Sequence, residues 1–415
     1  MRGGNSIAVI GGGFVGLCCA LHLQRIGQSV TLVDPGDPVR AASYGNSGQF
    51  AVGEVVPLAV PGVLYSVPKW LLDPLGPLAI RWRDVPALIP WLARFLSAAR
   101  QPRMESVSSA MAALCDLIHF DYEPLLTAAA AHDVVVNKSC IRLYETRQHW
   151  EREHVTWQLR ERAGLRYELL DGEALRAREP EIDPRFGFGV VMEGRTFIKN
   201  PLRLMQAFAA CFERQGGVVL EGEVVDFTHY GNRVDAIRLT DGRHLAVAGV
   251  VIAAGAWSKA LCRRLGDRVP LECERGYHVM LPQPEVRLGC SLTLPSRGFG
   301  LVPMEGGLRV AGTVELARVD APPNFARADR LIENARLVFP RLNIEGATRW
   351  MGNRPSLPDS LPVIDRASRF ANAYYAFGHG HMGVSWAATT GRLIAGLVGN
   401  RPLNFDLSPY RLARF

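Results

Sequence analysis

Apolar residues near the N-terminus occur in the order strand, helix, strand. Residues 6–10 (SIAVI) form a short, β-branched run that is typical of a buried parallel strand. Apolar positions between residues 15 and 23 suit a helix packed on a sheet, and Gly27 ends this pattern. Residues 29–33 (SVTLV) predict a second strand, and Asp34 closes it.

The glycines between the first strand and the helix are spaced as G-x-G-x-x-G. We expect Gly11 to make a tight turn, Gly13 to let the backbone approach a pyrophosphate, and Gly16 to let helix and strand pack closely. The helix N-terminus favours a phosphate because its N–H groups and dipole attract negative charge. Asp34 lies 18 residues after Gly16, near the ~20 expected of an acid that binds ribose hydroxyls. A glycine-rich turn alone would not explain Asp34, so the unit predicts dinucleotide binding.

The rest of the chain indicates that this nucleotide fold is interrupted. A nicotinamide domain would continue directly into further βα units, whereas residues 35–110 are rich in Pro, Trp and Gly. A buried strand returns only at residues 250–254, before Gly255, and another signal precedes a helical stretch at 384–398. This arrangement favours FAD over NAD, with a second domain threaded through the first.

Composition limits the class of protein. A chain of 415 residues with 48% hydrophobic and 21% charged residues suits a soluble protein of two domains. The formal net charge is +7, but no compact basic run or RNA-binding motif occurs, so we expect no nucleic acid partner. The eight cysteines show no C-x-x-C pair and no metal-ligand spacing, which predicts buried thiols and no metal site. No signal peptide or apolar run of about 18 residues is present, so we expect a cytoplasmic protein.

Motifs spread over most of the chain resemble the D-amino acid oxidase superfamily, and within it the bacterial D-amino acid dehydrogenases and their glycine and sarcosine oxidase relatives. The matching segments are residues 43–49 (SYGNSGQ), 251–258 (VIAAGAWS), 275–278 (RGYH), 353–359 (NRPSLPD), 361–364 (LPVI) and 378–383 (GHGHMG). The resemblance implies an α/β fold with a FAD-binding Rossmann domain of the glutathione reductase type, discontinuous in sequence. It also implies an α+β substrate domain with a mixed or antiparallel sheet.

The resemblance and the strand signals together suggest domain limits. We expect the FAD-binding domain in residues 1–85, 195–268 and 345–415, and the substrate-binding domain in residues 86–194 and 269–344. The strands of the second domain are expected at 140–145, 186–193, 271–281 and 299–315. Residues 155–180 and 320–340 are expected to form surface helices.

The implied activity is the FAD-dependent oxidation of the C–N bond of a small amino acid, with hydride transfer from the substrate Cα to flavin N5. D-Proline, 4-hydroxy-D-proline or a similar D-amino acid is the favoured substrate. A glycine-, sarcosine- or opine-type amine oxidase subunit and a non-catalytic FAD-binding subunit remain open. So do the electron acceptor, oxygen or a respiratory quinone, and the choice between homo- and hetero-oligomers.

Three residues are candidates for contact with the substrate. The resemblance places Arg354 on the substrate carboxylate, because a guanidinium fork binds a carboxylate through two hydrogen bonds; a structural ion pair with Asp359 is the alternative. Alternation along a strand lets only one of Tyr277 and His278 reach the pocket. We favour Tyr277, and the alternative is a core aromatic residue beside a buried histidine.

The resemblance also implies which residues contact FAD. They are Gly11, Gly13, Phe14, Val15, Gly16, Asp34, Ser43, Asn46, Ser47, Gly48, Gln49, Val224, Ala254, Gly255, Trp257, Gly378, His379, Gly380, His381, Met382 and Gly383. The helix after Gly383 would direct its N-terminus at the ring edge that gains charge on reduction. His379 and His381 are candidate bases, with hydrogen-bonded structural groups as the alternative. The matching C-terminal segments contain no cysteine, so we expect non-covalent FAD.

Residues 57–100 raise the question of a membrane contact. Trp and Leu occur there together with Arg81, Arg83 and Arg94, a mixture that suits a lipid interface. Peripheral contact with the inner membrane is one interpretation. A packed helical region of the fold is the other, and we prefer it.

Overall fold

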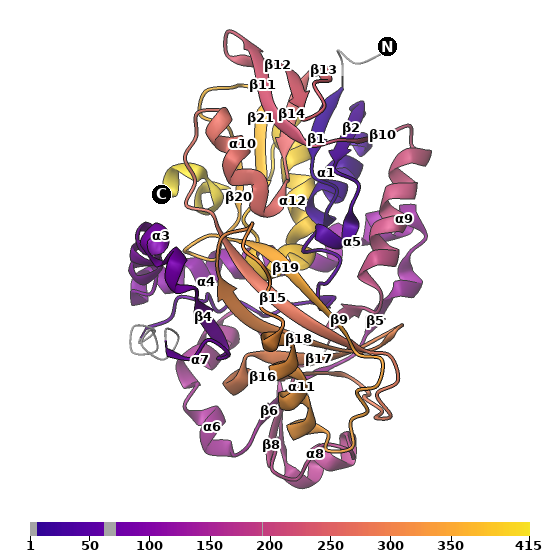
Figure 1. The fold of residues 1–415 in the computed structure, drawn as a ribbon, viewed down its shortest axis with the longest axis vertical. Coiled ribbons are helices and arrows are strands. Elements are labelled where there is room, and N and C mark those ends of the chain that lie inside the picture. Colours follow the sequence, from indigo (N-terminus) through magenta and orange to yellow (C-terminus); the bar gives the residue numbers. More distant parts are fainter. Residues whose placement is uncertain (1–5, 62–71, 193) are drawn as a thin grey trace.

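The computed structural model describes residues 6–61, 72–192 and 194–415 of the chain. Two large sheets dominate it, one at each end of the molecule in the view of Figure 1. The upper sheet in that view contains the N-terminal strands, and the lower sheet is built mainly from the middle of the chain. The architecture is therefore α/β with a second, mixed sheet, as expected.

The upper sheet has six strands, and all but β20 run parallel. In spatial order they are β10 (Val218–Glu221), β2 (Val30–Asp34), β1 (Ile7–Ile10), β14 (Gly249–Ile252), β21 (Ala373–Phe377) and β20 (Val363–Arg366). The strands predicted from the apolar runs at 6–10, 29–33 and 250–254 are confirmed as β1, β2 and β14. Their nearly complete burial explains why their sequences are continuously apolar.

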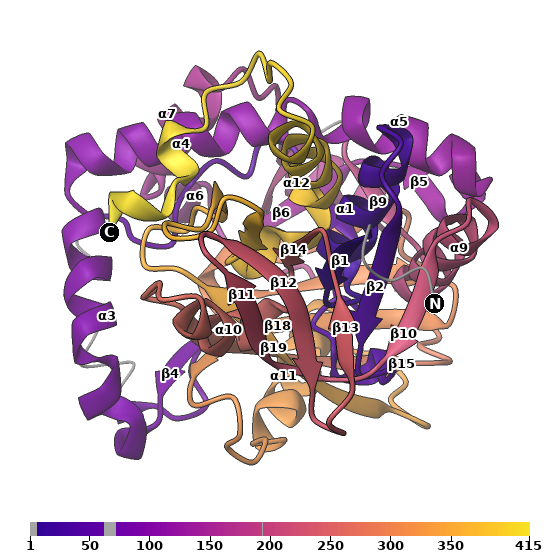
Figure 2. The same ribbon diagram turned by 90° about the horizontal axis from the view of Figure 1, so that it is seen from above.

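Helices cover one face of the upper sheet (Figure 2). They share one apolar cluster and are α1 (Phe14–Arg25), α12 (Gly383–Val398), α9 (Pro201–Arg214), α5 (Ile118–Ala129) and α4 (Gln101–Cys115). The opposite face is covered by α10 (Ser258–Arg264) and by a three-stranded sheet of β11 (Val224–Tyr230), β12 (Arg233–Leu239) and β13 (His244–Ala246). Both faces of the sheet are thus shielded, as a parallel sheet requires.

The lower sheet has nine strands, most of them antiparallel. In spatial order they are β19 (Thr348–Ser356), β15 (Glu272–Leu281), β18 (Gly307–Leu316), β17 (Phe299–Met304), β16 (Ser291–Leu294), β6 (Cys140–Tyr144), β8 (Phe188–Met192) and β7 (Glu168–Asp171), with β4 (Leu78–Ile80) beside β18. Helix α11 (Ala326–Val338) packs on one face of the sheet through an apolar cluster. The other face borders the cavity described below.

Most of the elements expected in this part of the chain are confirmed. The four predicted strand segments coincide with β6, β8, β15 and the hairpin of β17 and β18. Residues 155–180 differ, because they contain the edge strand β7 between α7 (His154–Arg162) and α8 (Gly172–Arg178). The prediction of helix alone was wrong there, since a four-residue edge strand that pairs on one side carries little apolar alternation. The short helix α6 (Arg147–Glu151) follows β6.

The packing of the elements differs from the expected domain limits at two places. Helices α4 and α5 belong to the core of the upper sheet, although they lie in the range 86–194. Strand β19 pairs with β15 in the lower sheet, although it lies in the range 345–415. A small sheet of β3 (Gln49–Phe50), β9 (Thr196–Ile198) and β5 (Val135–Asn137) adds a further connection. Such long-range packing leaves no signal in local sequence patterns.

The segment considered for a membrane contact is partly described. Helix α3 (Val85–Ala98) buries Trp91, whose ring stacks on Phe95 at 5.2 Å between centroids. Trp82, Ile89 and Leu72 are exposed, and residues 62–71 lie outside the described residues. The buried Trp91 supports the packed interpretation of α3. Among the described residues, no helix is both long and apolar enough to cross a bilayer.

Candidate active site

A cavity of about 530 Å³ extends from the glycine turn after β1 to the lower sheet. This volume lies within the range of small-molecule sites. Gly11, Gly13 and Asp34 border one part of it, and Arg354 and Ala311 border another. One continuous space thus joins the two parts of the fold that were expected to bind a nucleotide and a substrate.

The glycine turn has the geometry that its spacing predicts. Gly11 has a φ of 110°, a conformation that side chains rarely adopt, and a Cβ there would overlap the carbonyl oxygen of Ala253. A Cβ at Gly16 would overlap the carbonyl oxygen of Gly11, so only glycine lets α1 approach the turn this closely. At Gly13 a Cβ would lie 3.0 Å from Ser43 Oγ, and both residues border the cavity. These three positions leave room for a ligand at the N-terminus of α1.

Two side chains complete this end of the cavity. The Asp34 carboxylate accepts hydrogen bonds from the N–H of Gly12 at 2.6 Å and from the N–H of Gly36 at 3.0 Å. Ser43 Oγ accepts a hydrogen bond from the N–H of Phe14 at 3.1 Å, in the first turn of α1. A carboxylate at the end of β2 and a hydroxyl at the positive end of a helix suit a ribose and a phosphate, respectively. The residues present therefore fit an adenine dinucleotide.

Most of the residues implied to contact FAD border the cavity. They are Gly11, Gly13, Val15, Asp34, Ser43, Asn46, Ser47, Gln49, Val224, Ala254, Gly255, Trp257, His379, Gly380, His381 and Gly383. Five others do not border it and are Phe14, Gly16, Gly48, Gly378 and Met382. Gly16 and Gly48 instead allow close backbone contacts, since a Cβ at Gly48 would overlap the carbonyl oxygen of Ile198.

The turn between β21 and α12 supplies another wall. Gly378 and Gly380 have φ values of 85° and 53°, and α12 begins at Gly383 beside the cavity. His379 Nε2 is 2.9 Å from Thr390 Oγ1, and burial lowers the pKa of His379 to about 3. Burial also lowers the pKa of His381, which borders the cavity. Both imidazoles are therefore neutral near pH 7, and His379 matches the alternative of a hydrogen-bonded structural group.

Arg354 reaches the cavity from β19. Its Nη1 donates hydrogen bonds to Glu274 Oε1 at 3.1 Å and to the carbonyl oxygen of Thr313 at 3.5 Å. A Cβ at Gly276 would overlap the guanidinium, so the Arg354 side chain crosses β15 over this glycine. Arg354 is 23% exposed whereas Glu274 is only 3% exposed, which leaves part of the guanidinium open to a ligand.

The alternative partner considered for Arg354 is engaged elsewhere. Asp359 Oδ2 accepts a hydrogen bond from Arg414 Nε at 2.8 Å. A structural ion pair between Arg354 and Asp359 is therefore absent. The ion pair with Glu274 fixes the position of Arg354 from the adjacent strand.

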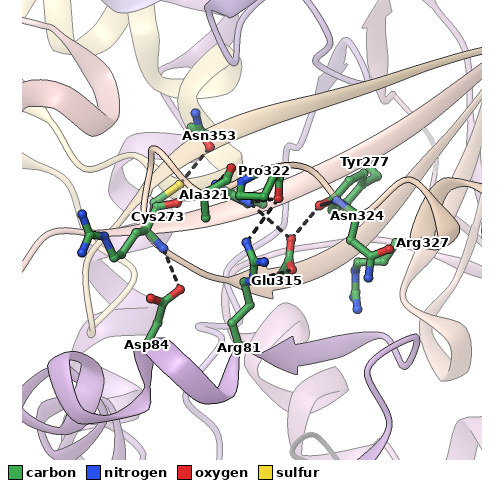
Figure 3. Close-up of polar contacts among 12 residues, drawn as sticks. Arg81, Asp84, Cys273, Tyr277, Glu315, Ala321, Pro322, Asn324, Arg327 and Asn353 are labelled. Atoms are coloured by element: carbon green, nitrogen blue, oxygen red, sulfur yellow. Dashed lines mark hydrogen bonds and ion pairs between the residues drawn. The ribbon is translucent and has the colours of Figure 1, made fainter.

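The side chain of Tyr277 makes its packing and hydrogen-bond contacts on the α11 side of the lower sheet. Although Tyr277 borders the cavity, its ring belongs to the apolar cluster under α11. Its hydroxyl donates a hydrogen bond to Glu315 Oε2 at 2.6 Å and accepts one from the N–H of Asn324 at 3.0 Å, as Figure 3 shows. Arg81 lies 4.0 Å from Glu315 in the same cluster. Tyr277 thus stabilises the far face of the sheet.

His278 lies on the opposite face of β15, as strand alternation requires. Its ring stacks on Trp350 with 4.9 Å between centroids, and its Nδ1–H donates a hydrogen bond to the carbonyl oxygen of Gly45 at 3.0 Å. Burial lowers the pKa of His278 to about 3, so the ring is neutral. His278 therefore supports the wall of the cavity by holding Trp350.

Trp350 borders the cavity, although no sequence motif predicted it as a site residue. Its Nε1–H donates a hydrogen bond to the carbonyl oxygen of Val39 at 3.0 Å, and a Cβ at Gly45 would overlap its ring. Arg40 is a second residue that was missed, and its guanidinium lies 5.6 Å from the ring centroid of Trp257. These contacts join segments far apart in the sequence, so no local motif identifies them.

Among the described residues, no group of three or more His, Cys, Asp or Glu side chains is placed to hold a metal ion. All eight cysteines are buried and unpaired, as expected. None of them borders the cavity.

Comparisons with known proteins agree with this geometry. The sequence model of the DAO family, described as "FAD dependent oxidoreductase", matches residues 6–397. A D-amino-acid oxidase of Bradyrhizobium diazoefficiens is 36% identical over 100% of both chains. A D-amino acid dehydrogenase of Sinorhizobium medicae is 28% identical over 99% of both chains.

Solved structures show the same fold. The glycine oxidase from Geobacillus kaustophilus superposes with a TM-score of 0.74 over 100% of both chains, at 21% identity. An L-amino acid deaminase from Proteus vulgaris gives a TM-score of 0.75 over 100% of this chain and 98% of that chain, at 13% identity. Together with the glycine turn and its cavity, these findings show that the chain belongs to the DAO family of FAD-dependent oxidoreductases.

Proposed function

We propose that this enzyme oxidises the C–N bond of a D-amino acid whose α-carboxylate binds Arg354. The observation that carries this proposal is that Arg354 and the glycine turn border one cavity. A cation at one part of this cavity and a dinucleotide site at another suit a substrate anchored by its carboxylate beside the cofactor. The two relatives named for D-amino acids support the choice of the D-enantiomer.

Each group has a separate task in this proposal. When bound, FAD supplies a two-electron acceptor for the hydride that leaves the substrate Cα. Arg354 neutralises and orients the carboxylate, and Glu274 holds the guanidinium in place. His381 and His278 stay neutral, so they add no positive charge that would repel the substrate amine. The N-terminus of α12 and the turn before it would hold the ring edge that gains negative charge.

We also infer that FAD is held without a covalent bond. No cysteine among the described residues borders the cavity, and His379 Nε2 is engaged with Thr390. The upper sheet with its helices would hold the nucleotide, and the lower sheet would hold the substrate. Acid precipitation should therefore release all of the FAD into the supernatant. Flavin that stays with the pellet would contradict this inference.

Reduction of the bound flavin by candidate amines under anaerobic conditions tests the proposed function. The panel contains D- and L-alanine, D- and L-proline, 4-hydroxy-D-proline, glycine and sarcosine. We expect D-enantiomers to bleach the flavin absorbance and L-enantiomers to leave it unchanged. Bleaching by glycine or sarcosine alone would favour the amine oxidase alternative, and no bleaching by any amine would favour a non-catalytic subunit.

The acceptor and the location of the enzyme are tested separately. Oxygen consumption during turnover distinguishes an oxidase from a dehydrogenase, which instead reduces a soluble quinone. The packed interpretation of α3 is the one that we favour; the alternative, a peripheral contact of this region with anionic lipid, is supported by the exposed Trp82 and Ile89 beside Arg83. The lipid contact predicts that wild-type protein sediments with anionic vesicles and that a Trp82→Glu/Ile89→Glu variant does not; a wild type that stays in solution contradicts the contact.

A further inference from the structure

Three arginines converge on one glutamate near the active-site cavity. Glu54 lies 2.9 Å from Arg142, 3.1 Å from Arg160 and 3.8 Å from Arg195. The side chains of Arg160 and Arg195 are 3% and 6% exposed. The four residues come from β6, α7, the segment before β9 and the loop after β3, so distant parts of the chain bring this charge together.

Positive charge exceeds negative charge in this cluster. The second carboxylate nearby belongs to Glu153, which is 4.0 Å from Arg142 and 29% exposed, and which also accepts a hydrogen bond from Tyr144. Three guanidinium groups thus face two carboxylates. The buried Nε atoms of Arg142, Arg160 and Arg195 have no hydrogen-bond partner. Buried cations with unused donors favour a further anion.

A row of cross-strand neighbours connects the cluster to the cavity. Ala311 on β18 pairs with Gly300 on β17, Gly300 pairs with Thr293 on β16, and Thr293 pairs with Arg142 on β6. Paired residues point to the same face of a sheet. Ala311, Gly300 and Thr293 all border the cavity and are small. Arg142 does not border it, but it is the next residue in this row, directly beside Thr293. The buried Oγ1 of Thr293 also has no hydrogen-bond partner.

Strand spacing gives the separation of the backbones beneath the two positive groups. The guanidinium of Arg354 reaches the carbonyl oxygen of Thr313 on β18, and β6 lies three strand positions further along the sheet. At about 4.8 Å per strand this distance is about 14 Å. With the guanidinium groups at the same separation, a charge-assisted hydrogen bond of about 2.8 Å at each end leaves about 8 Å for the ligand. This span suits a six-carbon diacid better than it suits aspartate.

We propose that Arg142 and Arg195, together with Thr293, bind a second acidic group of the substrate. The preferred amine is then dicarboxylic, with a chain length like that of 2-aminoadipate or of an opine-type amine. This inference rests on the proposed function for the position of the α-carboxylate at Arg354. Glu54 is a positioning residue. Its carboxylate pairs with the three guanidinium groups and offsets part of their positive charge.

Binding of simple acids to the FAD-loaded protein tests the subsite without catalysis. In isothermal titration calorimetry we expect adipate to bind at least about tenfold more tightly than hexanoate, because it adds one charge-assisted contact. Arg142→Gln should remove this advantage and leave hexanoate affinity unchanged. Arg349→Gln, at an exposed arginine of the same sheet, is the matched control and should keep the advantage. Equal affinities of wild type for the two acids would overturn the proposal.

A second variant covers the case in which Arg142→Gln fails to fold. Thr293→Val removes one hydroxyl and no charge, and it should weaken adipate but not hexanoate binding. Flavin reduction then separates the two proposals. Preferential reduction by D-2-aminoadipate over D-norleucine supports both, whereas equal rates overturn the subsite and leave amine oxidation standing. Tight adipate binding with no reduction by any amine leaves the subsite standing and overturns the proposed function.

Discussion

Arg354 and Glu274 face each other on neighbouring strands, with Nη1 and Oε1 3.1 Å apart. The glutamate is almost fully buried, whereas part of the arginine is open to the cavity. The pair therefore presents a positioned guanidinium rather than a flexible surface cation. A substrate carboxylate that binds there gains a fork whose orientation is already set.

Replacing Arg354 tests this role directly. Arg354→Leu should raise KM for a D-amino acid strongly, at a cost of about 2–5 kcal/mol, because a buried charge pair loses one partner. FAD should remain bound, since the glycine turn is unaltered. Arg349→Leu on the same strand removes an exposed ion pair with Asp329 and should leave the kinetics unchanged. Steady-state kinetics of both variants test whether Arg354 binds the substrate carboxylate. An unaltered KM in Arg354→Leu would show that another group binds it.

Asp34 should control retention of the cofactor. Asp34→Ala removes the carboxylate that accepts hydrogen bonds from the N–H groups of Gly12 and Gly36. We expect purified Asp34→Ala to contain less FAD than wild type, as measured by the ratio of absorbance at 450 and 280 nm. Asp241→Ala, at an exposed aspartate of a turn, serves as the control with full occupancy. Equal FAD content in both variants would count against a ribose contact.

Tyr277 should affect stability rather than the chemical step. Tyr277→Phe leaves the buried carboxylate of Glu315 without the hydrogen bond that the tyrosine hydroxyl donates, which costs about 1–3 kcal/mol. The thermal unfolding midpoint should fall, while the rate of flavin reduction by a D-amino acid should stay within about twofold of wild type. A large loss of rate with unchanged stability would reverse this assignment and return Tyr277 to the pocket.

Buried histidines predict how stability depends on pH. Burial lowers the pKa values of His22, His278 and His379 to about 3, whereas an unfolded chain protonates histidine near 6.5. Between these values the unfolded state binds more protons, so stability falls as pH decreases from about 6.5. Each group contributes up to about 1.4 kcal/mol per pH unit in this window.

Thermal unfolding of the holoenzyme at pH 5 and pH 7 measures this effect. We expect a clearly lower midpoint at pH 5. His379→Asn should reduce the difference between the two pH values, because one titrating group is lost. His244→Asn, at an exposed histidine, should not. Identical midpoints of the wild type at both pH values would contradict neutral burial of these rings.

Local spacing explains which features were predictable from the sequence. The strand, glycine turn, helix and acid of residues 6–34 are contiguous, so their pattern alone identified β1, α1, β2 and Asp34. Alternation also showed correctly that Tyr277 and His278 point to opposite faces. It could not show which face borders the cavity, because that depends on pairing with β18 and on the irregularity between Arg275 and Tyr277.

The arginine cluster, in contrast, could not be predicted from local sequence patterns. Glu54, Arg142, Arg160 and Arg195 are separated by up to 141 residues, the difference between positions 54 and 195. Each looks like an ordinary surface charge in the sequence. Only the order of strands in the lower sheet places one member of the cluster, Arg142, beside Thr293, which borders the cavity.

Trp350 has a consequence for how ligands enter and leave. Its strand belongs to the lower sheet, yet its indole is hydrogen-bonded to Val39 and packed against Gly45 in a segment that follows β2 of the upper sheet. A hinge motion that separated the two sheets would break these contacts of the Trp350 indole and disturb its stacking on His278. We therefore expect ligands to enter and leave through local rearrangement of loops and side chains around the cavity, while the contacts between the two sheets persist.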